Sequence, residues 1–168
     1  MDDFRPAFER MIRDEGGFVL HTISGDRGGQ TYAGIARNMH PKWPGWAAID
    51  AKGEPSAQLV YDFYRANFWD DINGDQITDQ TVASDIFNFY VNTGRPAKVL
   101  AQVVVGATPD GAFGPKTIEA INAADPEKFI LAYALAKIAR YRDIVQRDRT
   151  QIKFLLGWLN RTLNGLKS

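Results

Sequence analysis

Apolar side chains recur at intervals of three or four residues through most of this chain, and that spacing constrains its fold more than any other feature. The period places the apolar residues of a segment on one face of an α-helix. The first predicted helix carries the pattern at Phe4, Phe8, Met11 and Ile12. We expect further helices at residues 32–39, 56–68, 81–93, 115–123, 125–145 and 152–159. The chain is therefore predicted to be mainly α.

One segment fits two structures. Pro96 stands where a first helical residue is favoured, and Gly106 closes the segment. Its valines also permit a strand. The apolar residues of the segment are Val99, Leu100, Val103 and Val104.

A glycine-rich stretch at residues 16–31 interrupts the helical pattern. Gly16 and Gly17 should end the first helix. The stretch has no long apolar run, and the triplets at residues 24–26 and 27–29 are each suited to a tight turn. We predict a small β-hairpin near residues 18–31.

The net charge of zero hides an uneven distribution. Residues 1–94 hold 8 Lys and Arg against 14 Asp and Glu, and residues 95–168 hold 12 against 6. A basic half could face an anionic cell wall, nucleic acid or membrane surface, or it could simply complement the acidic half. We expect the basic run from Lys137 to Lys153 to be a solvated helix face. The change of charge predicts two regions, 1–94 and 95–168, packed as one compact unit.

Glu15 stands at the predicted carboxyl end of the first helix. Unpaired backbone carbonyls there carry partial negative charge, which disfavours an ionised carboxylate. Aromatic neighbours such as Phe18 or Tyr32 would add desolvation in the same direction. A carboxyl that keeps its proton near neutral pH can protonate the leaving oxygen of a glycoside. Glu15 is therefore a candidate general acid.

Asp26 and Thr31 follow within the glycine-rich stretch. A hairpin would fold both back toward Glu15, where together they could hold a water molecule. An inverting glycosidase needs such a water between two carboxyl groups about 6.5–9.5 Å apart. Gly28 and Gly29 leave room for a sugar against the backbone. Glu15, Asp26 and Thr31 are the predicted catalytic residues.

This stretch resembles glycoside hydrolase family 108, a group of N-acetylmuramidases found as phage endolysins and secretion-associated bacterial muramidases. The EGG(Y/F) motif of the family matches Glu15, Gly16, Gly17 and Phe18, and its D-x-GG-x-T-x-x-GI pattern matches Asp26, Gly28, Gly29, Thr31, Gly34 and Ile35. The resemblance implies a lysozyme-like helical fold over the catalytic region 1–94. It also implies that Glu15 is the catalytic acid.

A second motif lies in the C-terminal half. The sequence from Asp110 to Thr117, DGAFGPKT, resembles the DG-x-x-G-P-x-T signature of helical peptidoglycan-binding modules. The resemblance implies a peptidoglycan-binding region over residues 95–168. A tight turn in which Asp110 bonds its own backbone and Pro115 starts a helix would explain the same residues.

Aromatic and amide side chains are the remaining candidates for holding a sugar. An aromatic ring offers a flat apolar face to a pyranose. The predicted substrate-binding residues are Gly28, Gly29, Tyr32, Trp43, Trp46, Asn88 and Tyr90. They would surround a substrate lying between the Glu15 helix, the glycine-rich loop and the helix that contains Asn88. Core packing and interhelical hydrogen bonding are the alternatives for these side chains.

Metal and cofactor chemistry have no support in the sequence. There is no cysteine, and His21 and His40 lack the spacing of metal ligands. No phosphate loop or dinucleotide fingerprint occurs. We expect no metal and no cofactor.

Together these features predict a muramidase that hydrolyses the β-1,4 bond between N-acetylmuramic acid and N-acetylglucosamine during cell-wall lysis. A non-catalytic peptidoglycan-binding or secretion-associated adaptor is the alternative, and a chitosanase-like glycanase is a third.

The predicted partner is a peptidoglycan glycan strand, with no nucleic acid and no stable membrane insertion. No signal peptide is recognisable, so we expect synthesis in the cytoplasm, release through a holin or another export route, and action on the wall as a monomer.

Overall fold

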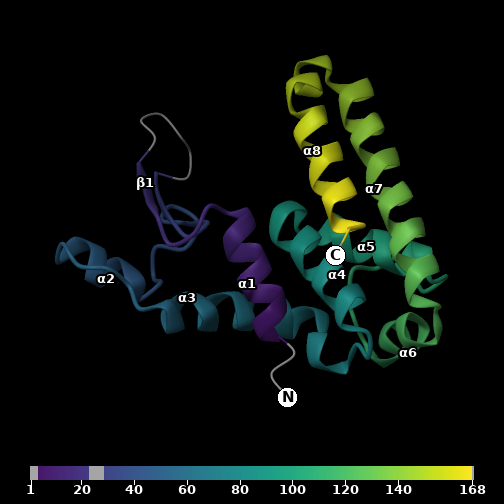
Figure 1. The fold of residues 1–168 in the computed structure, drawn as a ribbon, viewed down its shortest axis with the longest axis horizontal. Coiled ribbons are helices and arrows are strands. Elements are labelled where there is room, and N and C mark those ends of the chain that lie inside the picture. Colours follow the sequence, from purple (N-terminus) through teal and green to yellow (C-terminus); the bar gives the residue numbers. More distant parts are fainter. Residues whose placement is uncertain (1–3, 23–28, 168) are drawn as a thin grey trace. The chain divides into compact units, whose positions relative to one another are not determined.

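The computed structural model describes residues 4–22 and 29–167, and it is mainly helical with one small sheet (Figure 1). The predicted fold class, a lysozyme-like helical fold with a small β element, is confirmed. Contacts divide the chain into two compact units, Met1–Asp71 and Ile72–Ser168. The predicted boundary after residue 94 stays a prediction.

The first unit begins with helix α1 and a three-stranded antiparallel sheet in the order β1-β2-β3. Two helices, a π-helix and a 3-10 turn complete it. Its elements are α1 (Phe4–Asp14), β1 (Leu20–Thr22), β2 (Gln30–Tyr32), β3 (Ile35–Ala36), α2 (Gly45–Asp50), α3 (Ala57–Tyr64) and η1 (Arg65–Trp69), with η2 (Asp70–Ile72) at the division between the units.

Two strands replace the predicted helix at residues 32–39, which is wrong. Tyr32 pairs with Ile35 across a two-residue turn made by Ala33 and Gly34. Both turn residues have positive φ, 47° and 81°, as a type I′ hairpin turn requires. The apolar spacing in this segment therefore belongs to a hairpin. β1 also pairs with β2, so the predicted β element near residues 18–31 is confirmed. Residues 23–28 lie outside the described residues.

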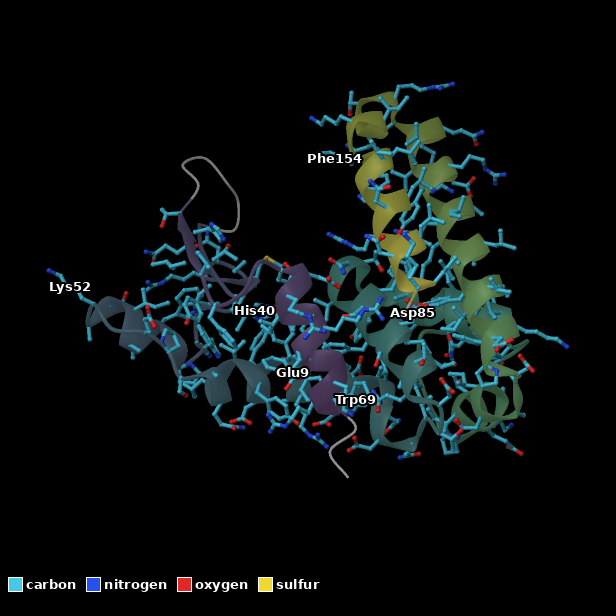
Figure 2. The ribbon with its side chains drawn as sticks, in the orientation of Figure 1. Glu9, His40, Lys52, Trp69, Asp85 and Phe154 are labelled. Carbon is cyan, nitrogen blue, oxygen red and sulfur yellow. The ribbon has the colours of Figure 1, made fainter. Side chains whose placement is uncertain are left out.

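Aromatic rings fill the core between α1 and α3. The buried ring of Phe4 lies 4.7 Å from that of Tyr61 and 5.2 Å from that of Trp69 (centroid to centroid; Figure 2 labels Trp69). Phe8 packs edge-on against Tyr61 at 5.1 Å. This packing fixes α1 along α3 and η1, and so positions Glu15, which directly follows α1.

The second unit is built from helices among its described residues. They are α4 (Gln80–Thr93), α5 (Arg95–Val104), α6 (Pro115–Ala123), α7 (Pro126–Arg147) and α8 (Ile152–Gly165), with short 3-10 turns η3 (Gly74–Gln76) and η4 (Arg149–Gln151). Asp79 and Asp125 cap α4 and α7 by accepting the backbone N–H of Val82 and Lys128, each at 2.9 Å. Within this unit α7 and α8 form an antiparallel pair (Figure 1).

Helix α5 settles the ambiguity at residues 96–106 in favour of a helix. Ala97, Ala101 and Gln102 are fully buried, whereas Val103 is exposed. Small residues face inward because α5 packs closely against α4 and α7.

A buried ion pair joins α4 to α7. Lys137 Nζ donates to Asp85 Oδ1 at 2.7 Å, and the two side chains are 5% and 13% exposed. The same ammonium lies 4.3 Å from the centre of the Tyr133 ring. The expectation of a solvated basic face is therefore wrong for Lys137, which carries its charge into the core only because Asp85 neutralises it.

In the part of the chain that the structure describes, none of the helices combines the length and the apolar run needed to cross a membrane. Among the same residues, no three histidine or acidic side chains come close enough together to hold a metal ion.

Candidate active site

Glu15 directly follows Asp14, the last residue of α1, so it lies at the carboxyl end of the helix as predicted. The N–H of Gly17 donates to the Ile12 carbonyl at 2.9 Å, and the N–H of Gly16 donates to the Arg13 carbonyl at 3.2 Å. Gly16 and Gly17 have φ of 86° and 89°, so these bonds form a Schellman motif in the left-handed region that glycine favours. The motif turns the chain sharply and leaves the side chain of Glu15 half-buried at the negative end of the helix.

The carboxylate of Glu15 lies over Gly34, in the β2–β3 turn. A Cβ atom built on Gly34 would be 3.4 Å from Glu15 Oε2 and 2.5 Å from the hydroxyl of Tyr64. A side chain at position 34 would therefore displace the Tyr64 hydroxyl and would touch the Glu15 carboxylate. Gly34 provides both the positive φ of the turn and the space that brings Glu15 and Tyr64 together.

Tyr64, at the end of α3, anchors the turn. Its hydroxyl donates to the Ala33 carbonyl at 2.8 Å, and the ring is buried. Burial raises the pKa of Tyr64, and the negative charge of Glu15 adds to that rise. Sequence patterns assigned Tyr64 no role beyond the core. One sequence feature could have indicated a role for Tyr64, namely a tyrosine on the inward face of a helix. The hydroxyl of a buried tyrosine usually needs a hydrogen-bond partner.

Among the described residues, no hydrogen bond or ion pair engages the Glu15 carboxylate. A half-buried carboxyl that has no partner among these residues can meet a ligand. In chemical terms it can donate a proton to a leaving oxygen or accept one from a hydroxyl.

Thr31 lies in the middle of β2, where it pairs with His21 of β1 and with Ala36 of β3. It is half-buried, and alternation along the strand places it on the sheet face opposite to Tyr32. Asp26 and Gly28 lie outside the described residues, so the predicted grouping of Glu15, Asp26 and Thr31 stays a prediction. Gly29 has a φ of 66°, and an added Cβ would be 3.1 Å from the Asn38 side chain.

Tyr32, Trp43 and Trp46 are buried in the first unit. Tyr32 stacks on Trp43 at 6.1 Å, and the indole N–H of Trp46 donates to the His40 carbonyl at 2.8 Å while Arg37 covers its ring. Burial raises the pKa of Tyr32, with a contribution from the Glu54 carboxylate. These contacts are those of core residues, which was the alternative to sugar stacking.

Of these three rings, Trp43 also lines a cavity of ≈ 680 Å³ together with His40, Phe63 and Asn67. Tyr32 and Trp46 do not border that cavity. Trp43 is therefore the aromatic candidate that has open space beside it.

Asn88 and Tyr90 lie on α4 in the second unit. Both side-chain amide atoms of Asn88 are buried and have no hydrogen-bond partner among the described residues. Buried amides are almost always paired, so the Asn88 amide is an exception among the described residues. Tyr90 has Lys98 Nζ 5.0 Å from the centre of its ring. Their predicted place in one groove with Glu15 stays a prediction.

The DGAFGP turn is held from within by Gln102. The amide nitrogen of this fully buried side chain donates to Asp110 Oδ1 and to the Ala112 carbonyl, both at 2.9 Å, and its oxygen accepts the Gly111 N–H at 2.8 Å. The pKa of Asp110 is lowered first by the N–H of Ala112 and then by Gln102. The signature residues thus fold the turn, as the structural alternative predicted. Beside the turn lies a cavity of ≈ 660 Å³ that Thr108, Lys116 and Thr117 help to line.

A helix that ends on a half-buried glutamate beside a small antiparallel sheet, within a mainly helical chain, defines a lysozyme-like fold. The profile of the family Glycosyl hydrolase 108 matches residues 8–94, and that of a Predicted Peptidoglycan domain matches residues 96–163. The chain therefore belongs to the family Glycosyl hydrolase 108. The resemblance inferred from the sequence motifs is confirmed.

A solved structure agrees with this assignment. The structure of Brucella abortus SagA matches with a TM-score of 0.73 and 25% identity, covering 98% of this chain and 91% of SagA. No curated protein matches the chain. The family and its peptidoglycan domain make this chain a glycoside hydrolase that has peptidoglycan as its partner and the cell wall as its place of action.

Proposed function

We propose that this hydrolase is a muramidase that cuts the β-1,4 bond between N-acetylmuramic acid and N-acetylglucosamine, with Glu15 as its general acid. The observation that carries the proposal is the position of the Glu15 carboxylate. It is half-buried at the carboxyl end of α1, lies over Gly34, and has no protein partner among the described residues. A group held in this way can meet the bridging oxygen of a glycan that lies over the β2–β3 turn.

Glu15 would protonate the leaving oxygen as the glycosidic bond breaks, and the positive charge that develops on the sugar would be quenched by water. On this proposal Asp26 orients that water or stabilises the charge, and Thr31 assists from β2. Gly28 and Gly29 would let the glycan approach the backbone. The reaction consumes one water molecule and no other reactant. The leaving sugar takes the proton of Glu15, and a carboxylate accepts a proton from the attacking water.

The other residues that would contact the substrate are proposed from the hydrogen-bonding and stacking properties of their side chains. The unpaired amide of Asn88 can exchange hydrogen bonds with the acetamido group that both peptidoglycan sugars carry. The ring of Trp43 borders open space and can stack on a sugar or a stem-peptide side chain. Trp46, Tyr32 and Tyr90 stay secondary candidates because each already packs against other side chains.

The second unit is proposed to bind the wall at the DGAFGP turn. Its internal hydrogen bonds give the turn one fixed shape, and the adjoining cavity offers hydroxyl and ammonium groups from Thr108 and Lys116. Peptidoglycan presents carboxylates and amides that such groups can recognise. Phage origin, release through a holin and a monomeric state stay predictions.

Two glutamates on the first helix give a matched test. Glu15→Gln and Glu9→Gln make the same chemical change, but Glu9 is exposed on α1 (Figure 2). We expect Glu15→Gln to lower the rate of wall hydrolysis at least about a hundredfold, the loss typical of a general acid. Glu9→Gln should keep the wild-type rate, and both variants should keep the wild-type melting temperature.

The same assay separates the alternative function. If wild-type protein sediments with purified walls but releases no fragments under any condition, the chain is a binding or adaptor protein. If Glu15→Gln hydrolyses walls as fast as Glu9→Gln, Glu15 is not the acid.

A further inference from the structure

Helix α8 carries an apolar stripe that the second unit leaves uncovered. Ile152, Leu156 and Leu163 are 58%, 69% and 48% exposed. With Leu159 and Leu166 they recur at alternating intervals of four and three residues, which places all five on one side of a helix. Five aliphatic residues on one face form a contiguous strip, and a strip of this kind marks an interaction surface.

Charge around the stripe is strongly positive. Residues 147–168 hold five Lys and Arg and a single acidic residue, Asp148. Asp148 is occupied in capping η4, where it accepts the backbone N–H of Thr150 at 3.0 Å and its hydroxyl at 2.6 Å. Helix α8 itself contains no Asp or Glu. A basic helix with an apolar stripe is typical of a segment that lies on a membrane surface.

Basic side chains and exposed apolar side chains occur together at the connection between α7 and α8. Arg147, Arg149 and Lys153 are exposed at the connection between the helices, next to Ile152. Phe154 is also exposed there, with Lys153 Nζ 5.0 Å from its ring centre (Figure 2). Within the second unit, this end extends away from α4, α5 and α6 (Figure 1). It is therefore the part of the unit that a flat surface can reach.

We infer that the α7–α8 end and the apolar stripe of α8 bind an anionic lipid surface. Apolar burial and electrostatic attraction add in such binding, so both features of this region contribute. A second copy of the chain fits less well, because two α8 stripes packed together would bring basic residues against basic residues with no acidic partner on either helix. A soluble anionic polymer would use the charges but would leave the leucines in water.

Vesicle sedimentation of the full chain tests this inference. We expect binding to phosphatidylcholine vesicles that contain phosphatidylglycerol, weakening as salt is added, and little binding to pure phosphatidylcholine. Leu156→Ser should lower the partition coefficient at least about tenfold, because a leucine side chain no longer enters the lipid. Val103→Ser is the matched control: Val103 is 56% exposed on α5, away from the stripe.

A second variant tests the contribution of the basic residues to vesicle binding. Replacing Arg149 and Lys153 together by glutamine should weaken binding to the anionic vesicles about fivefold or more per charge. Both changes lie at exposed positions, so circular dichroism should report an unchanged fold.

Three results would overturn the inference. One is failure of the wild-type chain to sediment with anionic vesicles. Another is equal binding by the Leu156→Ser and Val103→Ser variants. The third is a dimer in sedimentation velocity that Leu156→Ser abolishes while vesicle binding is absent, since the occupant of the stripe would then be a second copy of the chain.

Discussion

The carboxylate of Glu15 and the hydroxyl of Tyr64 meet at one glycine. A Cβ on Gly34 would be 3.4 Å from Glu15 Oε2 and 2.5 Å from Tyr64 Oη. Tyr64 in turn donates to the carbonyl of Ala33, the residue before that glycine. The end of α1, the β2–β3 turn and the end of α3 are thereby tied together at the proposed acid.

Gly34→Ala tests whether this space is required. The substitution adds backbone strain at a φ of 81° and a clash with the Tyr64 hydroxyl, so it should destabilise the chain and shift the turn that lies beneath Glu15. Gly106→Ala is the control, because Gly106 has a φ of 70° but an added Cβ there would meet no atom within 4 Å. We expect Gly106→Ala to cost about 1–2 kcal/mol from strain alone. Gly34→Ala should cost about 1–3 kcal/mol more.

Hydrolysis of soluble glycan fragments should separate the same two variants, because Gly106 lines the cavity proposed to bind the intact wall. Gly34→Ala should lose most of its activity on these fragments at a temperature where it is still folded, whereas Gly106→Ala should hydrolyse them at the wild-type rate. Equal stability and equal activity of the two variants would show that the contact at Gly34 does not position the site.

Because the Tyr64 hydroxyl is buried, we expect the free energy of unfolding to fall at alkaline pH. Its pKa in the folded chain is raised from an ordinary value of 10.0 by burial and by Glu15. Below pH 10 the Tyr64 hydroxyl keeps its proton in both the folded and the unfolded state. Its contribution to the free energy of unfolding is therefore fully present there. Above pH 10 the unfolded chain loses the proton more readily, and the free energy of unfolding falls.

Tyr64→Phe should therefore flatten that fall when urea unfolding is followed through the alkaline range. At neutral pH it should cost about 1–3 kcal/mol, since the buried Ala33 carbonyl loses its donor. A variant with the wild-type slope above pH 10 would assign the alkaline loss to other groups, of which the fully buried Tyr133 is one.

Lys137→Met tests the buried ion pair of the second unit. The change leaves the Asp85 carboxylate buried without its partner, so we expect a loss of about 3–5 kcal/mol in urea unfolding. Arg142→Met is the matched control, because Arg142 pairs with Asp143 at 2.8 Å on the surface. That variant should unfold at nearly the wild-type urea concentration. Similar losses in both would mean that water reaches Asp85.

Gln102→Leu tests whether the DGAFGP turn needs its internal amide. The variant keeps the volume of the side chain but leaves the buried Gly111 N–H unpaired, which should cost about 1–3 kcal/mol, while the Ala112 carbonyl keeps the Thr117 hydroxyl as a donor. If the turn binds the wall, the fraction of the Gln102→Leu protein that sediments with purified walls should also fall. Unchanged wall binding by a folded Gln102→Leu protein would place the binding surface elsewhere.

Local chemistry made most of the helices predictable. Ser56 caps α3, Asp125 caps α7, and Pro115 starts α6, and each lies where residue preferences alone put it. Gly16 and Gly17 end α1, so the position of Glu15 also followed from the sequence. These features depend on residues within one helical turn of each other.

Long-range contacts account for the errors. The segment after Tyr32 is a hairpin because Tyr64, 31 positions away from Ala33, holds the turn by a hydrogen bond that no local pattern reveals. Gln102 is buried and Val103 exposed because the Asp110 turn folds back onto α5. The roles of Asp26 and Thr31 rest on the family motif, since the spacing of residues does not fix where a hairpin tip lies.

The most direct test of the central claim is the chemical identity of the fragments released from purified peptidoglycan. Fragments would be reduced with borohydride and analysed by mass spectrometry after treatment with wild-type protein and with Glu15→Gln. We predict that the wild-type chain releases fragments whose reduced end is N-acetylmuramic acid and that Glu15→Gln releases almost none. Fragments ending in N-acetylglucosamine, or the same products from Glu15→Gln, would contradict a muramidase that uses Glu15 as its acid.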